Sequence, residues 1–257
     1  MIKKITKYTA IAVIWIAIWE LVSLAVANEL LFPSPITVCI ALWALLREGD
    51  FYLTVGTSIL RIIVGTAIGI AIGIVGGILS ARFRTAREFF SPMLAIIKST
   101  PVASFIILLV LWLKRDTTPM VICAIMVTPV VWSNVEMGIK KTDRALLEMA
   151  CVYKMPRGRQ ISSIYVPSTL PYFISAMRSS LGMAWKAGIA AEVLLQPILS
   201  IGKQIFESKY MLETADLFAW TVVVIVLSVI IERVLLSLLA HASLRYSIQC
   251  MGGDING

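Results

Sequence analysis

The sequence DRALLEMACVYKMPRGRQISSIYVP, residues 143–167, is a basic interruption between very apolar segments of the chain. It is too polar to cross a bilayer. Its apolar residues nevertheless recur at intervals of three and four, as they do in a helix with one apolar face: Leu146, Leu147, Ala150, Cys151, Ile161 and Ile164. Pro156 and Pro167 each break the helical pattern. We therefore expect an amphipathic segment at the water side of a membrane that offers a docking surface.

The composition on either side of this segment is that of a membrane protein. The chain has 257 residues, of which 59% are hydrophobic and 15% charged, and its mean hydropathy is +0.89. A helix that spans a bilayer needs about 20 mostly apolar residues, and several such runs are present. The sequence predicts an all-α, polytopic protein with one transmembrane domain over residues 1–257 and about six spans, at 8–27, 62–80, 92–113, 119–139, 170–195 and 217–240.

The distribution of basic residues predicts the orientation of these spans. Lys and Arg are concentrated before the first span, at 81–88 and at 140–159, and Arg245 follows the last span, whereas few lie at 28–52, 114–116 and 196–216. By the positive-inside rule the first set faces the cytoplasm, and both termini with it. This topology also accounts for the net charge of +8, which would otherwise suggest a nucleic-acid partner.

Metal, redox and nucleotide chemistry find no support in the sequence. The four cysteines and the single His241 have no spacing typical of metal ligands or of a redox pair. The chain also lacks the glycine-rich phosphate loop of nucleotide-binding proteins. We expect no catalytic residue, metal site or cofactor in this chain, so any ATP and magnesium would be bound by a partner subunit.

Two small-residue stripes predict close helix packing. Gly65, Gly69, Gly73 and Gly77 recur every four residues, and so do Ser180, Ala184 and Gly188. Residues at this spacing share one helix face, and a face without large side chains lets a second helix approach closely.

Basic and broken segments within the apolar runs are candidates for a solute pathway. Lys98, Ser99, Thr100 and Pro101 interrupt the third run, and a broken helix inside a membrane requires surrounding protein or a water-filled cavity. The alternative is an interfacial loop that begins the third span. Arg61, Arg178 and Lys186 suit an anionic solute, but snorkelling or ion pairing explains them as well.

The segment 143–167 resembles a signature of permease subunits of binding-protein-dependent ABC importers. That signature reads E-A-A, three residues, G, nine residues, I-x-L-P. Here Glu148-Met149-Ala150 is followed by Cys151-Val152-Tyr153, then by Lys154 in the glycine position, and after nine more residues by Ile164-Tyr165-Val166-Pro167. Because a lysine resists the left-handed turn that glycine permits, we expect Pro156 and Gly158 to take over the bend.

The resemblance covers nearly the whole chain and points to one branch of the family. Pro33-Ser34-Pro35, Ser58-Ile59-Leu60-Arg61, Ser99-Thr100-Pro101, Leu170-Pro171 and Ala191-Glu192 occur in the order seen in permeases for sulfonates, taurine, nitrate and bicarbonate, a branch that also carries thiamine-precursor pyrimidines. The resemblance implies a type I permease fold in the cytoplasmic (inner) membrane. It also implies a coupling helix that docks into an ATP-binding subunit.

From this resemblance we expect a translocation subunit that pairs with a second permease copy, two ATP-binding subunits and an external solute-binding protein. The coupling residues would be Glu148, Met149, Ala150, Cys151, Val152, Tyr153, Lys154, Met155, Pro156, Arg157, Gly158, Ile164 and Pro167. The solute would be a small organic anion such as a sulfonate or taurine, or nitrate, with a thiamine-precursor pyrimidine as the alternative.

Two other functions are compatible with the residues. An ion-driven secondary transporter would use Glu20, Glu136, Glu192 or Lys186 as coupling groups. A membrane-anchored assembly factor would recruit a soluble partner through the basic segment without transport. The first would not need a docking segment, and the second would give no solute uptake under any driving force.

Overall fold

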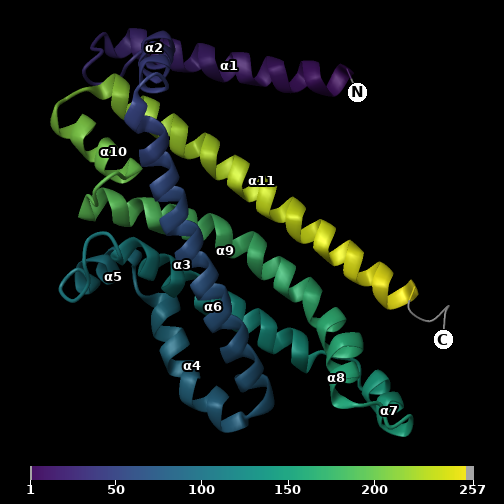
Figure 1. Cartoon of the computed structure of the whole chain (residues 1–257). Helices are drawn as coiled ribbons and strands as arrows, with labels where there is room; N and C mark the ends of the chain where they lie inside the picture. The colour runs from purple at the N-terminus through teal and green to yellow at the C-terminus, as the bar shows by residue number, and fades with distance from the viewer. Residues whose placement is uncertain (1, 253–257) are drawn as a thin grey trace. The chain divides into compact units, whose positions relative to one another are not determined.

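The computed structural model describes the backbone of residues 2–252 and the side chains of residues 10–237, and every element in it is helical (Figure 1). The predicted all-α class is therefore confirmed. The elements are α1 Ile2–Val26, α2 Pro35–Leu45, α3 Gly49–Arg82, α4 Arg84–Ser99, α5 Val102–Leu109, α6 Thr118–Lys140, α7 Arg144–Val152, α8 Arg157–Gln160, the π-helical turn η1 Ile161–Tyr165, α9 Val166–Leu195, α10 Ile201–Tyr210 and α11 Thr214–Gly252.

Within the described residues, three helices are long and apolar enough to cross a membrane: α3, α6 and the part of α11 at Thr214–Ser237. The pair α4 and α5, bent by 103° at Thr100-Pro101, would make a fourth span. The other two expected spans are helical but do not meet this criterion. The apolar part of α1 at Ala10–Val26 is shorter, and α9 carries Arg178, Lys186 and Glu192.

The described contacts divide the chain into two compact units. Unit 1 comprises Met1–Ile59 and Glu192–Leu227, and unit 2 comprises Leu60–Ala191 and Ser228–Gly257. The helices α3, α9 and α11 each contribute residues to both units.

Unit 1 contains the short helix expected after the Pro33-Ser34-Pro35 turn. Ser34 is the N-cap of α2, and its hydroxyl accepts a hydrogen bond from the Thr37 N–H at 3.2 Å. Such a cap satisfies one of the free N–H groups of the first turn. Aromatic side chains fill the space around this turn: Phe218 lies 6.0 Å from Trp19 and 5.5 Å from Phe32, centroid to centroid.

Unit 2 is built on the close approach of α3 to α6. A Cβ atom added at Gly69 would lie 2.7 Å from the Ala124 carbonyl oxygen, and one at Gly73 would lie 2.7 Å from Val131 Cβ. Cβ atoms at Gly65 and Gly77 would also collide with α6. The α6 side of this contact is fully buried at Ile122, Val127 and Val131. The four glycines thus allow a helix spacing that even alanine would prevent.

A further glycine on α3 makes room for an aromatic ring. A Cβ atom at Gly76 would overlap the indole of Trp132, and the Trp132 Nε1–H donates a hydrogen bond to Ser80 Oγ at 2.9 Å. The ring of Phe90, on α4, lies 5.3 Å from the same indole. The four-residue repeat did not point to Gly76, because this glycine lies one position outside that repeat.

The α9 helix joins the same core through its small residues. Ser180 and Ala184 are buried, and a Cβ atom at Gly188 would lie 2.7 Å from Ile62 Cγ1 and 2.9 Å from Cys123 Sγ. Cys123 in turn donates to the Ala184 carbonyl at 3.4 Å. The small face of α9 therefore packs on α3 and α6 within unit 2.

Candidate functional site

The segment with the importer signature folds as helix, turn and helix. Asp143 is the N-cap of α7, and its carboxylate accepts a hydrogen bond from the Ala145 N–H at 2.9 Å. The helix ends at Val152, Pro156 is the N-cap of α8, and η1 then leads into α9. The arrangement bends at residues 153–156, as expected, and does not continue straight through Pro156.

The conformation of Lys154 differs from expectation. Lys154 has φ of 50°, so the lysine itself adopts the left-handed conformation for which glycine is favoured. Its N–H bonds to the Cys151 carbonyl at 3.1 Å, and the Met155 N–H bonds to the Ala150 carbonyl at 2.9 Å. These two bonds form a Schellman motif, the usual closure of a helix whose next residue is left-handed.

The expectation that Gly158 takes over the turn is therefore wrong. No described glycine has a positive φ, and a Cβ atom at Gly158 would meet nothing within 4 Å. Pro156 acts differently: it begins α8 and holds Met155 outside the helical region, since a residue before proline is pushed to extended backbone. The turn tolerates Lys154 because its exposed side chain has room and only the backbone is strained.

Apolar side chains of this segment face two directions. Ala150 and Ile164 are buried and anchor the segment to unit 2, whereas Val152 and Tyr153 are 78% and 77% exposed. Leu146, Met149 and Cys151 are also exposed, so the residues expected to form one apolar face are divided between the body and the outside. We call Leu146, Met149, Val152 and Tyr153 the outer α7 face. An exposed apolar cluster beside charged residues is typical of a docking surface.

At the break between α4 and α5, neighbouring side chains donate hydrogen bonds to a backbone carbonyl at the end of α4. The hydroxyls of Ser99 and Thr100 both donate to the Ile96 carbonyl, at 3.1 Å and 2.8 Å, and Pro101 begins α5. Lys98 is exposed and donates to Ser133 Oγ, on α6, at 3.4 Å. The sequence had not indicated Ser133.

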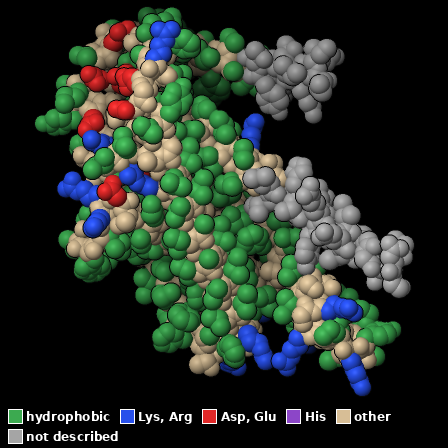
Figure 2. Space-filling model, viewed as in Figure 1, with side chains coloured by type: hydrophobic (Ala, Val, Ile, Leu, Met, Phe, Trp, Pro, Cys, Tyr) green, Lys and Arg blue, Asp and Glu red, His purple; other side chains and the backbone are tan. Residues whose placement is uncertain are grey.

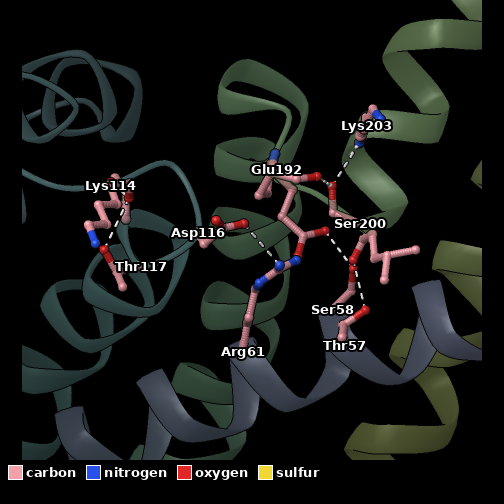
Figure 3. Close-up of polar contacts among 12 residues, drawn as sticks. Thr57, Ser58, Arg61, Lys114, Asp116, Thr117, Glu192, Ser200 and Lys203 are labelled. Atoms are coloured by element: carbon pink, nitrogen blue, oxygen red, sulfur yellow. Dashed lines mark hydrogen bonds and ion pairs between the residues drawn. The ribbon is translucent and has the colours of Figure 1, made fainter.

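The other candidate pathway cations lie in different surroundings. Arg61 is paired with Asp116 at 3.2 Å, and its side chain is only 11% exposed (Figure 3). Arg178 and Lys186, in contrast, are exposed residues of α9. They share their face with exposed Ser175 and Ser179, and a Cβ atom at Gly182 between them would meet nothing within 4 Å. We call Ser175, Arg178, Ser179, Gly182 and Lys186 the basic α9 face.

A buried carboxylate organises the start of α10 in unit 1 (Figure 3). Glu192 is fully buried, and its Oε2 accepts hydrogen bonds from Ser58 Oγ at 2.8 Å and from the Gly202 N–H at 3.3 Å. Ser58 Oγ also accepts from the Ile201 N–H at 2.9 Å, and Ser200 caps the helix through the Lys203 N–H at 3.1 Å. A carboxylate is favourable at a helix N-terminus, so Glu192 fixes the connection that follows α9.

Glu136, another acidic candidate of an ion-driven mechanism, has basic neighbours. Glu136, near the end of α6, contacts Arg87 at 3.1 Å and Lys140 at 2.5 Å. These contacts tie the end of α6 to α4. Among residues 10–237, no three His, Cys, Asp or Glu side chains come together as a metal site requires.

Known proteins resemble this chain over most of its length. Residues 69–246 match the family described as binding-protein-dependent transport system inner membrane component. The chain is 26% identical over 210 residues to the aliphatic sulfonates transport permease protein SsuC of Bacillus subtilis, which covers 81% of this chain and 76% of the relative. It is 27% identical over 204 residues to the nitrate import permease protein NrtB of Synechococcus elongatus, covering 75% and 73%.

Two further comparisons support the branch and the fold. The bicarbonate transport system permease protein CmpB of Synechococcus elongatus is 25% identical over 191 residues, covering 73% of this chain and 68% of the relative. The crystal structure of an amino acid ABC transporter with histidines shares the fold with a TM-score of 0.56 at 16% identity, covering 75% of this chain and 94% of that one. The chain belongs to the family of binding-protein-dependent transport system inner membrane components, as an ABC importer permease of the sulfonate, nitrate and bicarbonate branch.

Proposed function

We propose that the segment from α7 to η1 couples this permease to an ATP-binding subunit, and that two copies of the chain enclose a pathway for a small organic anion or nitrate. The observation that carries the coupling role is the outer α7 face: apolar residues at the end of a capped helix point away from the body that anchors them. We place this segment and both termini in the cytoplasm, because the connections richest in Lys and Arg lie on this side of the spans and the positive-inside rule assigns them to the cytoplasm.

The mechanism follows from the two anchoring points of the segment. Ala150 and Ile164 are buried against unit 2, so a displacement of α7 is transmitted to the helices that carry it. Each of the two permease copies would dock one partner subunit through its own α7–η1 segment. ATP-driven closure of the two partner subunits would move these segments and shift the permease pair between two states, each open to one side of the membrane. The permease contributes binding and movement, and the ATP hydrolysis takes place on the partner.

The basic α9 face supports the anionic class of solute. Charged residues in a membrane-spanning helix face protein or a water-filled cavity, and in the single chain Arg178 and Lys186 are exposed. A second copy or an aqueous pathway must therefore cover them. Lys98, beside the α4–α5 break, adds a third exposed cation, whereas Arg61 is already paired with Asp116. A neutral or cationic thiamine-precursor pyrimidine would gain less from these cations.

The coupling proposal is tested by co-purification of this chain with a co-expressed ATP-binding subunit. Val152→Asp places a charge in the outer α7 face, and we expect at least a tenfold loss of the co-purified subunit, because a buried unpaired charge is costly at an interface. Tyr210→Asp is the control, since Tyr210 is 76% exposed on α10 in the other unit. Equal recovery with both variants would refute the coupling role.

Uptake into reconstituted vesicles separates the proposed function from its alternatives. We expect uptake only with ATP inside, the partner subunits and the binding protein present. Uptake driven by an ion gradient alone would favour the secondary transporter, and no uptake under any condition would favour the assembly factor. Arg178→Gln and Lys186→Gln should reduce uptake of an organic anion without reducing ATPase recruitment. An unchanged uptake rate in the double variant would contradict the anionic pathway.

A further inference from the structure

A cavity of about 790 Å³ lies in unit 2, between the later part of α3, the end of α6 and the return from the coupling segment into α9. Its volume falls within the range of about 300–1,000 Å³ that is usual for ligand pockets. The outer α7 face does not line this cavity, whereas Val135, which faces Gly77 in the glycine contact of α3 and α6, does.

The wall of the cavity is apolar and follows the helices inward. On α3 the lining extends from Arg82 back to Ile74, and on the other side it extends from Tyr165 along α9 to Phe173. Each stretch covers eight helical steps, or about 12 Å along a helix axis. Since half of a bilayer's hydrocarbon core is about 15 Å thick, the apolar wall has a depth similar to that of one leaflet.

The rim of the cavity is basic. Arg82, at the end of α3, and Arg157, at the start of α8, both line it. Arg82 lies over the ring of Phe83 at 5.7 Å, and within residues 10–237 neither arginine has an acidic side chain at ion-pair distance. The space-filling view shows Lys and Arg gathered at this end of unit 2, around the α3–α4 turn and α7–α8 (Figure 2). The rim thus carries positive charge without its own counter-charge.

The cavity therefore combines a deep apolar wall with two guanidinium groups at its mouth.

We propose that this cavity binds an anionic phospholipid. The phosphate group contacts Arg82 and Arg157, because a guanidinium matches the geometry and charge of a phosphate. An acyl chain lies along Ile74, Ile78 and Val135. Basic pockets between transmembrane helices at the membrane surface bind anionic lipid head groups in this way. A soluble anion would use the rim alone and leave the apolar wall without a function.

The site would connect the membrane to the coupling segment. Arg157 and Tyr165 belong to the α8–η1 return, whereas Ile74 and Val135 belong to α3 and α6. A lipid in the cavity would therefore brace the return against the α3–α6 pair. The π-helical turn at Ile161–Tyr165 lines the cavity together with Arg157 and Gln160 of α8, and such turns are frequent at functional sites.

The test is native mass spectrometry of the full-length chain in a neutral detergent, titrated with phosphatidylglycerol and with phosphatidylcholine of identical acyl chains. We expect tighter 1:1 binding of phosphatidylglycerol. Arg82→Gln and Arg157→Gln should each weaken it about fivefold. Arg159→Gln is the matched control, because Arg159 lies on the same short helix, is exposed and does not line the cavity. It should change the affinity less than twofold.

A second variant tests the apolar part without changing any charge. Ala81 lines the cavity, so Ala81→Phe should fill it and abolish the preference for phosphatidylglycerol. If an arginine variant proves unstable in thermal unfolding, Ala81→Phe still tests whether the cavity binds the lipid.

Four results would overturn the proposal. Equal affinity for the two lipids would show that the site does not recognise an anionic head group. Equal losses of phosphatidylglycerol affinity in Arg157→Gln and Arg159→Gln would indicate that diffuse surface charge attracts the lipid. Displacement of the lipid by millimolar inorganic phosphate would assign the rim to a soluble anion. A shift of Ala81→Phe from dimer to monomer would show that a second copy of the chain covers the cavity.

Discussion

The α3–α6 contact and the turn after α7 place opposite demands on a residue. On α3, Gly69 and Gly73 have no positive φ and are needed because no Cβ atom would fit against α6. After α7, the backbone is left-handed, as a glycine would make it, but the residue is Lys154, whose side chain is exposed. The two properties of glycine, a missing side chain and a permissive backbone, are thus separated between two places in one unit.

The difference shows where this permease tolerates sequence change. Insertion of a side chain between α3 and α6 forces two packed helices apart, whereas a left-handed lysine raises the energy of one exposed residue by about 1–2 kcal/mol. The glycine contact is therefore a fixed part of unit 2. The segment from α7 to η1 is attached to it by a few buried residues and presents an outer surface.

The largest effect is expected from Gly73→Leu. Its side chain would collide with Val131, and we expect a loss of at least about 3 kcal/mol in the free energy of unfolding, because overpacking adds to the loss of helix contact. Gly56→Leu is the control on the same helix, since nothing lies within 4 Å of a Cβ atom there. Thermal unfolding in detergent measures the stability of both variants. Similar melting temperatures for Gly73→Leu and Gly56→Leu would contradict the close contact of α3 and α6.

The next effect concerns assembly with the ATP-binding subunit. Glu148 is the only acidic residue of α7, so Glu148→Lys makes the whole segment basic, and deletion of residues 152–158 removes the turn. We expect either change to reduce co-purification of the ATP-binding subunit at least tenfold, or about 1.4 kcal/mol. Membrane insertion should remain that of the unaltered chain in both variants, and Glu148→Lys should leave the melting temperature unchanged. Recovery of the partner at the usual level would contradict the coupling role.

A smaller effect is expected at the start of α7. Asp143→Ala removes the carboxylate that accepts from the Ala145 N–H, and a lost N-cap costs about 1 kcal/mol. Hydrogen exchange should accelerate in α7 and stay unchanged in α3 and α6, which would show that the segment opens independently of the glycine contact. Uniform acceleration across these helices would show instead that they form one cooperative unit.

The smallest effect is a gain in stability. Lys154→Gly relieves the left-handed strain and should stabilise the turn by about 0.5–1 kcal/mol. Lys141→Gly is the matched control, because Lys141 ends α6 with φ of −90° and gains nothing from glycine. A stabilisation of the same size in both variants would indicate that the loss of positive charge, and not the backbone, is responsible.

Much of this arrangement follows from sequence patterns with a clear physical basis. Apolar runs predict the helices, the Lys98 to Pro101 interruption predicts the bend between α4 and α5, and the signature predicts a helix, a turn and a second helix after Asp143. The branch of the family also follows from motif order and is confirmed by the comparisons.

Other features depend on partners that are distant in the sequence. The α3 helix begins at Gly49 and not near residue 62, and its early turns carry buried polar residues Thr54 and Ser58, which a search for apolar residues does not select. Ser58 is buried because Glu192 and Ile201, more than 130 positions later, provide its hydrogen bonds. Gly76 likewise acquires its role only from Trp132.

The Arg-Gly-Arg sequence at the start of α8 also makes the turn a marker of membrane sidedness. Arg157 and Arg159 are exposed, and a helix as short as Arg157–Gln160 opens readily. Trypsin cleaves after arginine, so it should cut here in membrane vesicles turned inside out and leave this peptide intact in right-side-out cells. An ATP-binding subunit seated on the outer α7 face would shield the same bonds, so that one digestion reports both the direction of the chain and the occupancy of the proposed coupling surface.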